Sequence, residues 1–493
     1  MIHRVTPGSF GSSMRSSRSV TPANEREVRR NDEESSKENF GLGRILQEDL
    51  TPFGKIPLII KGEGKEKSKE LRGIIAKEFH PEQAEAKENL DLVDGLKVEV
   101  DPYNLERLLK TLPNDSQVMI DSKIRYPLQD NVIPKIPEPE EERRPVLDIS
   151  RSTLGINRLW EQGFTGKGVG ICVIDSGLHP HQDLDGRIVA FADMNEGRKK
   201  PYDPYGHGTH VAGIAAGTGA ASEGVFMGVA PDAHLVGVRI TSVSEAIKGI
   251  QWAIENKDKY DIKVINMSLG DFPMRSWKDD PWAQAAEKAW DAGIVVVVAA
   301  GNEGPSKGSI STPGIAPSVI TVGAIDDKNT PQRDDDRIAD FTSRGPTTPD
   351  GLGKPDLVAP GVEIYGPLVP NSKLDNPDLP RVGNEYLAIS GTSQATPLVS
   401  GVAALLIQAN PDLTNNEIKE ILVSTAEDYL PRVNPYDQGA GLLDPMESLE
   451  VALRLRQEKG GDPTSIDNFE KKEVVPMHIA REHPKNPSST TQA

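Results

Sequence analysis

The central part of the chain, from about residue 150 to residue 455, alternates short apolar runs with longer amphipathic stretches. The apolar runs are nearly uninterrupted, which is typical of parallel strands covered on both faces. They fall at residues 169–174, 264–267 and 294–300, and stretches of helical spacing fall at residues 243–254, 282–290 and 396–408. This alternation predicts an α/β fold with a doubly wound, mostly parallel sheet, whose binding sites gather at the carboxyl ends of strands.

A smaller pattern of alternating elements precedes the central part, between residues 55 and 128. Strand-like runs fall at residues 56–60, 96–100 and 117–120, and stretches of helical spacing fall at residues 67–79 and 104–112. Their order predicts a small N-terminal α+β domain, either an open α/β unit or a ferredoxin-like unit.

The remaining segments are polar and lack periodicity. We expect residues 1–50 to form a disordered arm and residues 456–493 a disordered tail. Residues 131–148 are rich in proline and charge, which indicates an extended linker. The predicted domains are therefore residues 51–130 and residues 149–455.

Composition narrows the classes of function. The 493 residues carry 56 Lys and Arg against 74 Asp and Glu, a formal charge of −18. This balance argues against nucleic acid as a partner, because phosphate binding needs clustered cations. No stretch approaches the roughly 20 apolar residues of a membrane span, so a membrane partner is not expected.

Cys172 is the single cysteine of the sequence, so an intramolecular disulfide is excluded. We interpret it as a core residue of a buried strand rather than a nucleophile. The absence of disulfides is typical of a reducing compartment, and the Arg- and Ser-rich start has no apolar run of signal-peptide length. We therefore expect a cytoplasmic protein, with a transit peptide or secretion by a non-standard route as alternatives.

Asp175 ends the first apolar run of the central part and is followed by Ser176 and Gly177. A carboxylate at such a place is costly to bury unless it has a partner. Strand ends in this architecture face the ligand crevice, which makes Asp175 a candidate site residue. Taken alone, a turn or helix-cap aspartate is the simpler interpretation.

His207 lies in residues 206–213, GHGTHVAG. The small residues would allow the start of a helix to approach neighbouring backbone closely. His207 and His210 could instead ligate zinc. The segment has neither the HExxH spacing nor an acidic third ligand, so we disfavour that interpretation.

Ser393 lies in residues 390–397, SGTSQATP, before an apolar stretch of helical spacing. Because proline is tolerated in the first turn of a helix, Pro397 predicts that Ser393 lies at or just before a helix N-terminus. The free N–H groups and the positive dipole end there favour a developing anion. A serine N-cap is the structural interpretation, and it is compatible with a catalytic one.

The three candidates occur in the order Asp175, His207, Ser393, with spacings of 207 − 175 = 32 and 393 − 207 = 186. This is the order of acid, base and nucleophile in the subtilisin arrangement. Asn302 agrees with it, because the residue follows an apolar strand and an asparagine amide can donate to an oxyanion.

Residues 166–444 resemble the subtilase family of serine peptidases through the motifs around Asp175, His207 and Ser393 and through residues 268–270 and 300–302. They look most similar to its bacterial intracellular members, especially at residues 183–217, 343–346 and 356–361. The resemblance implies a serine endopeptidase of broad specificity that forms an acyl-enzyme and needs no cofactor for its chemistry. It implies that Asp175 orients His207, that His207 is the general base and then the general acid, and that Ser393 is the nucleophile. Asn302 and the Ser393 N–H would bind the oxyanion.

The resemblance also implies how substrate binds. Ser268, Leu269 and Gly270 are similar to the edge strand that pairs with the substrate backbone. Ala300 and Gly301 would help to wall the pocket for the residue before the scissile bond. Proteins or peptides are therefore the expected substrates.

The predicted N-terminal domain resembles the inhibitory propeptide of the family. This implies a zymogen that is inhibited by its own propeptide and matures by cutting itself in or near the linker. An unrelated accessory domain is the alternative.

The chain departs from the family pattern at several positions. Gln394 and Leu398 stand where Met and His are usual, and neither change removes a catalytic group. Residues 239–244 are short where the family usually has a loop and strand on the other side of the cleft, which leaves the distal subsites open. Asp271 replaces a common glycine, and its charge could disfavour acidic substrates.

Two other functions and one metal site remain as alternatives. A non-catalytic peptide-binding scaffold is disfavoured because all four catalytic positions are filled. A nucleotide-binding α/β protein is disfavoured because the glycine run at residues 166–170 precedes its strand instead of following it. Residues 334–336, three consecutive aspartates, could hold a structural calcium ion. A solvated acidic loop is the simpler interpretation of these aspartates.

Overall fold

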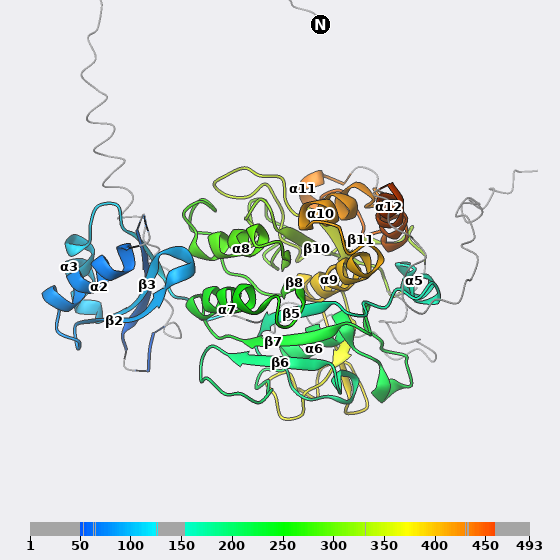
Figure 1. Ribbon diagram of the computed structural model, residues 1–493, viewed down its shortest axis with the longest axis horizontal. Helices are drawn as coiled ribbons and strands as arrows, with labels where there is room; N and C mark the ends of the chain where they lie inside the picture. The colour runs from blue at the N-terminus through cyan, green and yellow to red at the C-terminus, as the bar shows by residue number, and fades with distance from the viewer. Residues whose placement is uncertain are drawn as a thin grey trace, which may run out of the picture.

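The computed structural model describes residues 50–126 and 153–458, apart from residues 53, 63, 65, 125, 331, 429, 431 and 432. The predicted arm, linker and tail lie outside these residues, except for Leu50 and the last residues of helix α12. The described part of the chain consists of a small N-terminal unit beside a larger α/β unit (Figure 1).

The larger unit is built on an 8-stranded sheet of order β11-β10-β9-β8-β5-β7-β6, in which β12 also pairs with β10. All neighbouring pairs are parallel except the antiparallel pair of β10 and β11, which confirms the predicted mostly parallel sheet. The strands are β5 (Gly170–Asp175), β6 (Ile188–Asp193), β7 (His234–Arg239), β8 (Ile262–Met267), β9 (Val295–Ala299), β10 (Ile320–Asp326), β11 (Arg337–Ile338) and β12 (Leu357–Pro360).

Helices cover the sheet. Every residue of β5 and β9 is buried, which requires cover on both faces. Helix α6 packs against α9, and α7 packs against α8. None of the described helices combines the length and apolar character of a membrane span. The helices are α5 (Ile156–Glu161), α6 (His207–Ala216), α7 (Val243–Asn256), α8 (Pro281–Asp291), α9 (Thr392–Ala409), α10 (Asn415–Ser424), α11 (Pro435–Gln438) and α12 (Pro445–Glu458).

The order of the strands reverses beside β5. From β5 the chain continues to β6 and β7 on one side, and it then crosses to β8 and β9 on the other side. In parallel sheets, ligands bind outside the carboxyl ends of strands at such a switch point. The ends of β5, β8 and β9 are Asp175, Met267 and Ala299, which bring three of the predicted site segments to this edge.

Strands β13 (Ile364–Pro367), β14 (Arg381–Val382) and β15 (Tyr386–Ile389) form a separate antiparallel sheet of order β13-β15-β14. Helix α6 packs against β13.

The N-terminal unit has a four-stranded antiparallel sheet of order β2-β3-β1-β4 and lies beside α7 and α8 (Figure 1). Its order βαββαβ is ferredoxin-like, one of the two predicted forms. The sequence analysis missed β2, AEAKENL, because its composition favours a helix. Pairing with β3 determines its conformation instead. The elements are β1 (Ile56–Lys61), α2 (Lys67–Glu78), β2 (Ala84–Leu90), β3 (Gly95–Val100), α3 (Leu105–Thr111) and β4 (Gln117–Ile120).

Two lysines share one carboxylate in the larger unit. Lys354 Nζ lies 2.6 Å from Asp356 Oδ2 and donates to the Val319 carbonyl at 2.8 Å. Lys419 Nζ lies 3.1 Å from the other Asp356 oxygen and donates to the carbonyls of residues 317–319. Burial lowers the pKa of Lys354 to about 8, with Asp356 opposing this shift and Lys419 adding to it. The charged form of Lys354 is therefore less favourable in the folded chain than in water.

We predict that the free energy of unfolding rises with pH because of Lys354. Between about pH 8 and pH 10.5 the folded chain has lost this proton while the unfolded chain keeps it, so alkaline conditions favour the folded state. Relative to Lys354→Met, the parent should gain up to about 3 kcal/mol over that range. Denaturant titrations of both proteins, made in a Ser393→Ala background to prevent self-cleavage, measure the gain. A difference that does not change with pH would contradict the prediction.

Candidate active site

Asp175 is the last residue of β5 and is fully buried. Its Oδ1 accepts a hydrogen bond from the Ser176 N–H at 2.7 Å and lies 2.9 Å from Nδ1 of His207. An ionised carboxylate only accepts hydrogen bonds, so Nδ1 of His207 carries the proton of this contact. The pair compensates the burial of the Asp175 charge, which would be costly without it.

His207 is the first residue of α6 and is also fully buried. Its second ring nitrogen, Nε2, has no hydrogen-bond partner among the described residues. Gly208 permits the close approach that the sequence predicted. A Cβ atom on it would lie 2.2 Å from the Gly177 carbonyl oxygen and 3.0 Å from Cβ of Asp175. A larger residue would therefore push the helix away from β5.

Asp203 is a buried residue that the sequence analysis missed. Its Oδ1 accepts from the Gly206 N–H and the Ser176 hydroxyl, both at 2.8 Å. Its Oδ2 accepts from the N–H and the hydroxyl of Thr209 at 2.9 and 2.7 Å. Asp203 thus ties the turn after β5 to the first turn of α6 and orients His207. The available signal was an aspartate in a turn-forming segment, Asp-Pro-Tyr-Gly, directly before the histidine.

Ser393 lies in the first turn of α9 and is 2% exposed. Its hydroxyl donates to the Ser268 carbonyl at 2.7 Å, and among the described residues no hydrogen bond joins it to His207. The placement of Ser393 at a helix start agrees with the sequence prediction. The placement of Pro397 in the first turn was wrong, because α9 begins at Thr392. Pro397 therefore leaves the Ser393 carbonyl without its helical donor.

Asn302 follows β9 and lies beside the start of α9. Its Oδ1 accepts from the N–H and the hydroxyl of Thr392 at 2.9 and 3.0 Å. Because an N–H can pair only with the oxygen of the amide, these contacts fix the amide orientation. The Nδ2 group therefore faces away from Thr392 and makes no hydrogen bond to a described residue.

The predicted substrate-binding segments meet at the same place. Ser268, Leu269 and Gly270 follow directly on β8 without forming a strand themselves. Ser268 contacts Ser393 through its carbonyl, and the Gly301 N–H donates to the Thr392 hydroxyl at 3.2 Å. Ala300 is held by a hydrogen bond from its N–H to the Val322 carbonyl. These segments therefore reach α9 from the ends of neighbouring strands.

Residues 240–242 link β7 to α7 and form another flank of the site. A segment of the N-terminal part lies along this flank, where Lys123 and Ser242 form an isolated antiparallel bridge. The segment then reaches the catalytic candidates, because the Tyr126 ring lies 5.2 Å from the His207 ring, centroid to centroid.

Other candidate ligands and nucleophiles belong to the core. His210 is buried with Nε2 3.0 Å from the Leu387 carbonyl, and burial lowers the pKa of His210 to about 3, with His207 adding to the shift. Burial raises the pKa of the Cys172 thiol in β5, as expected for the predicted core residue. Among the described residues, including residues 334–336, no group of three or more His, Cys, Asp or Glu residues could hold a metal ion.

Gln394 follows the candidate nucleophile and is fully buried. Neither polar atom of its side chain has a hydrogen-bond partner among the described residues. A buried amide without partners costs about 1–3 kcal/mol. The residue therefore fills space beside Ser393 without an evident polar role.

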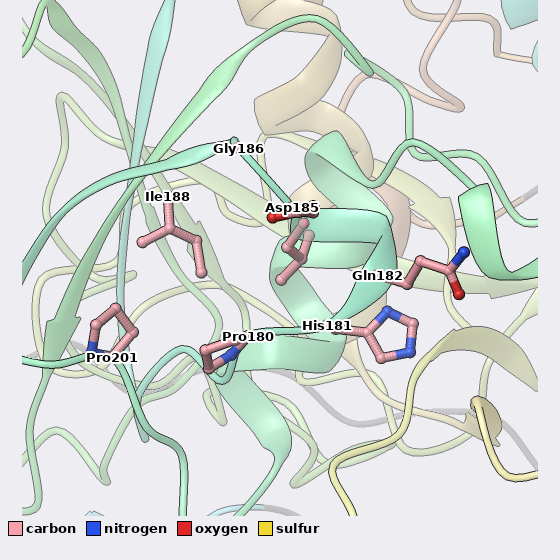
Figure 2. A pocket seen from close by; sticks show the side chains of 8 residues that line it. Pro180, His181, Gln182, Asp185, Gly186, Ile188 and Pro201 are labelled. Atoms are coloured by element: carbon pink, nitrogen blue, oxygen red, sulfur yellow. The ribbon is translucent and has the colours of Figure 1, made fainter.

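A pocket of about 410 Å³ lies outside this cluster. Figure 2 shows Pro180, Ile188 and Pro201 on its apolar side. None of the predicted site residues lines it. The lining residues are Pro180, His181, Gln182, Leu184, Asp185, Gly186, Ile188 and Pro201.

Several known proteases are similar to this chain in sequence. Serine protease AprX of Bacillus subtilis (strain 168) is 46% identical over 300 residues, covering 58% of this chain and 67% of the relative. Subtilisin E of the same organism is 40% identical over 297 residues, with coverage of 58% and 67%. Alkaline elastase YaB of Bacillus sp. (strain YaB) is 32% identical over 422 residues, covering 83% of this chain and 91% of the relative.

Among solved structures, fervidolysin of Fervidobacterium pennivorans is similar in fold, with a TM-score of 0.60 and 23% sequence identity. The match covers 80% of this chain and 61% of the fervidolysin chain. The sequence profile of the subtilase family matches residues 166–441, which is more than half of the chain. The chain therefore belongs to the subtilase family of serine proteases.

Proposed function

We propose that Asp175, His207 and Ser393 carry out peptide hydrolysis in this protease. The observation that carries the proposal is the buried contact of 2.9 Å between Asp175 and His207, which leaves Nε2 of His207 without a partner. A buried imidazole that is oriented by a carboxylate, and has one uncommitted nitrogen, is suited to take up and return a proton.

In the proposed reaction, the Ser393 hydroxyl exchanges its hydrogen bond with the Ser268 carbonyl for one with His207 Nε2. His207 takes the hydroxyl proton while Oγ attacks a peptide carbonyl, which gives a tetrahedral intermediate. The intermediate collapses to an acyl-enzyme as His207 protonates the leaving amine. Water then hydrolyses the ester by the same proton transfers in reverse.

Charge develops on the carbonyl oxygen of the substrate during both steps. The Asn302 Nδ2 group and the Ser393 N–H are suited to donate to it, because neither is committed to an acceptor within the described residues. The start of α9 adds the positive end of a helix dipole. The backbone of residues 268–270 is available to pair with the extended substrate.

We propose further that the N-terminal unit is an inhibitory propeptide. Its Asp121 is 2% exposed and accepts from the N–H and the hydroxyl of Ser244, both at 2.7 Å, at the start of α7. Lys97 pairs with Asp121 at 2.9 Å. Ser242 at the N-cap makes no side-chain cap of its own, so the N-terminal unit supplies a carboxylate that α7 lacks.

The N-terminal unit also makes hydrogen bonds to α7 and to the segment before α8. Glu88 accepts from Lys248 at 2.9 Å, and the Val118 carbonyl accepts from Arg275 at 2.7 Å. The segment after β4 then covers His207 with Tyr126. A chain docked in this way would exclude substrates until it is cut and released, which supports a self-processing zymogen.

We expect the wild-type chain to remove its own N-terminal unit and the Ser393→Ala variant to remain intact. Only an activated serine oxygen forms a bond with a fluorophosphonate probe, so the probe should label the wild type at Ser393 and not the variant. Intact mass and peptide mapping after purification measure both results. Ser390→Ala, a change in the same segment, is the matched control and should behave as the wild type. Processing by Ser393→Ala, or a folded wild type that the probe does not label, would favour a peptide-binding scaffold instead.

Asn302→Ala should lower turnover by roughly 100- to 1000-fold with a much smaller change in KM, because the lost donor acts mainly on the oxyanion. That magnitude was established on subtilisin itself. Steady-state kinetics on a peptide substrate measure kcat and KM separately. A loss confined to KM would mean that Asn302 binds substrate and does not stabilise the transition state.

Gln394→Met should make the enzyme sensitive to peroxide, whereas the wild type should tolerate it. A thioether beside the nucleophile oxidises to a sulfoxide and an amide does not. Replacing an unpaired buried amide should also raise the free energy of unfolding by about 1–3 kcal/mol. Residual activity after peroxide treatment measures the first effect, and Gln394→Leu is the resistant control. Rapid inactivation of the wild type, with one oxygen added near Ser393, would refute this prediction.

A further inference from the structure

Tyr126 fills an aromatic recess beside His207. Its ring centroid lies 4.6 Å from that of Tyr205 and 5.2 Å from that of His207, with interplanar angles of 42° and 44°. Its hydroxyl donates to the Ile240 carbonyl at 3.2 Å. Its own carbonyl accepts from the Tyr205 hydroxyl, also at 3.2 Å. The recess therefore contacts both the ring and the backbone of the residue that occupies it.

The segment that carries Tyr126 lies as an extended chain along residues 241–243. The Ile124 N–H donates to the Thr241 carbonyl at 2.8 Å, and the Val243 N–H donates to the Ser122 carbonyl at 3.1 Å. Pairing of this kind uses main-chain groups only and places no demand on the sequence of the bound chain. A substrate of another sequence can therefore take the same path once the N-terminal unit has left.

The position of the occupant follows from its carbonyl. The carbonyl of Tyr126 accepts a hydrogen bond from Tyr205, and among the described residues no hydrogen bond joins it to Asn302 or Ser393. It is therefore not held by the groups that would bind an attacked carbonyl. The segment approaches His207 in the direction of rising residue number, and the Tyr126 ring already contacts the His207 ring. We therefore assign the attacked carbonyl to the residue that follows the one in the recess. The recess thus receives the side chain one residue before the one whose carbonyl is attacked.

We propose that the recess selects protein substrates with an aromatic side chain at this position, and that Tyr205 is the residue that determines the selection. The inference rests on the proposed function, because it assigns a subsite of that active centre. A small side chain there would leave the faces of two rings uncovered. An aromatic pair contributes enough for a preference of up to about tenfold over alanine.

Tyr205 is held in place before a substrate arrives. Its N–H donates to Asp203 at 3.2 Å, and its carbonyl accepts from the Leu374 N–H at 3.0 Å. Its ring packs against a leucine-rich cluster of the larger unit, which limits its freedom. A pre-ordered ring loses little entropy on binding, so the stacking contact contributes to discrimination.

The test uses the full chain, expressed and allowed to process itself, with peptide pairs that differ only in Tyr, Phe or Ala at this position. The ratio of kcat/KM for the aromatic peptides over the alanine peptide should be about tenfold in the wild type. It should fall to within about twofold of unity in Tyr205→Ala and remain high in Tyr205→Phe, which keeps the ring. A ratio is used because each variant then serves as its own reference.

A second measurement needs no enzyme variant and so does not depend on the folding of Tyr205→Ala. Peptides with the sequence of residues 121–126 are tested as inhibitors of the wild type, with Tyr126 kept or changed to Phe or Ala. The Phe peptide keeps the ring and lacks only the hydroxyl that donates to Ile240, so it should inhibit no better than the Tyr peptide. The Ala peptide lacks the ring as well and should be up to about tenfold weaker than the Phe peptide.

Labelling of Ser393 by a fluorophosphonate probe separates the two ways of failing. Labelling and cleavage with a ratio near unity in the wild type, or equal inhibition by the three peptides, would overturn the aromatic subsite and leave the proposed function standing. A folded protein that is neither labelled nor active on any peptide would overturn the proposed function itself.

Discussion

The site depends on one buried pair, the Asp175 carboxylate and the His207 imidazole, neither of which is exposed. A charge in such a place is tolerable only with donors aimed at it, and each donor fixes a piece of the fold. The Ser176 N–H fixes the turn after β5, and the imidazole fixes the start of α6. Asp203 repeats the principle around that turn with donors from four residues, so β5 and α6 cannot shift independently.

The sequence correctly predicted the parts of the molecule in which a residue's own type reflects its surroundings, such as buried apolar strands and glycines at close contacts. Strands β5 and β9 are mostly apolar because both faces are covered. Gly208 is a glycine because a Cβ atom would meet the Asp175 side chain at the end of β5 and the Gly177 backbone in the turn after it. Elements whose structure is set by contacts with other segments show no such pattern in their own sequence. Strand β2 pairs at a sheet edge despite a composition that favours a helix, and Asp203 acts on N–H groups across a turn. The hydrogen bond from Ser393 to Ser268 joins distant segments, which no local spacing indicates.

The contact between the two units links folding to occupancy of the site. Helix α7 begins at Val243 without a side-chain cap of its own, and Asp121 of the N-terminal unit provides the acceptor. Burial opposes the charge of Lys97, yet Asp121 and the other nearby carboxylates raise the pKa of Lys97 overall, so the Lys97 ammonium keeps its charge. Departure of the N-terminal unit would leave the N–H groups of Val243 and Ser244, at the start of α7, without these acceptors. These hydrogen-bond donors at the start of α7 therefore have protein acceptors only while the N-terminal unit covers the site.

Both flanks of the site are short, and this concentrates recognition near the reacting groups. On one side, Asp271 commits its N–H and its carbonyl to Thr312, so the uncommitted backbone ends at Gly270. On the other side, three residues separate the end of β7 at Arg239 from the start of α7 at Val243. Main-chain pairing along so few residues contributes little affinity and no sequence preference. The proposed discrimination between substrates therefore rests on side chains that contact the catalytic groups directly, as the Tyr126 ring contacts His207.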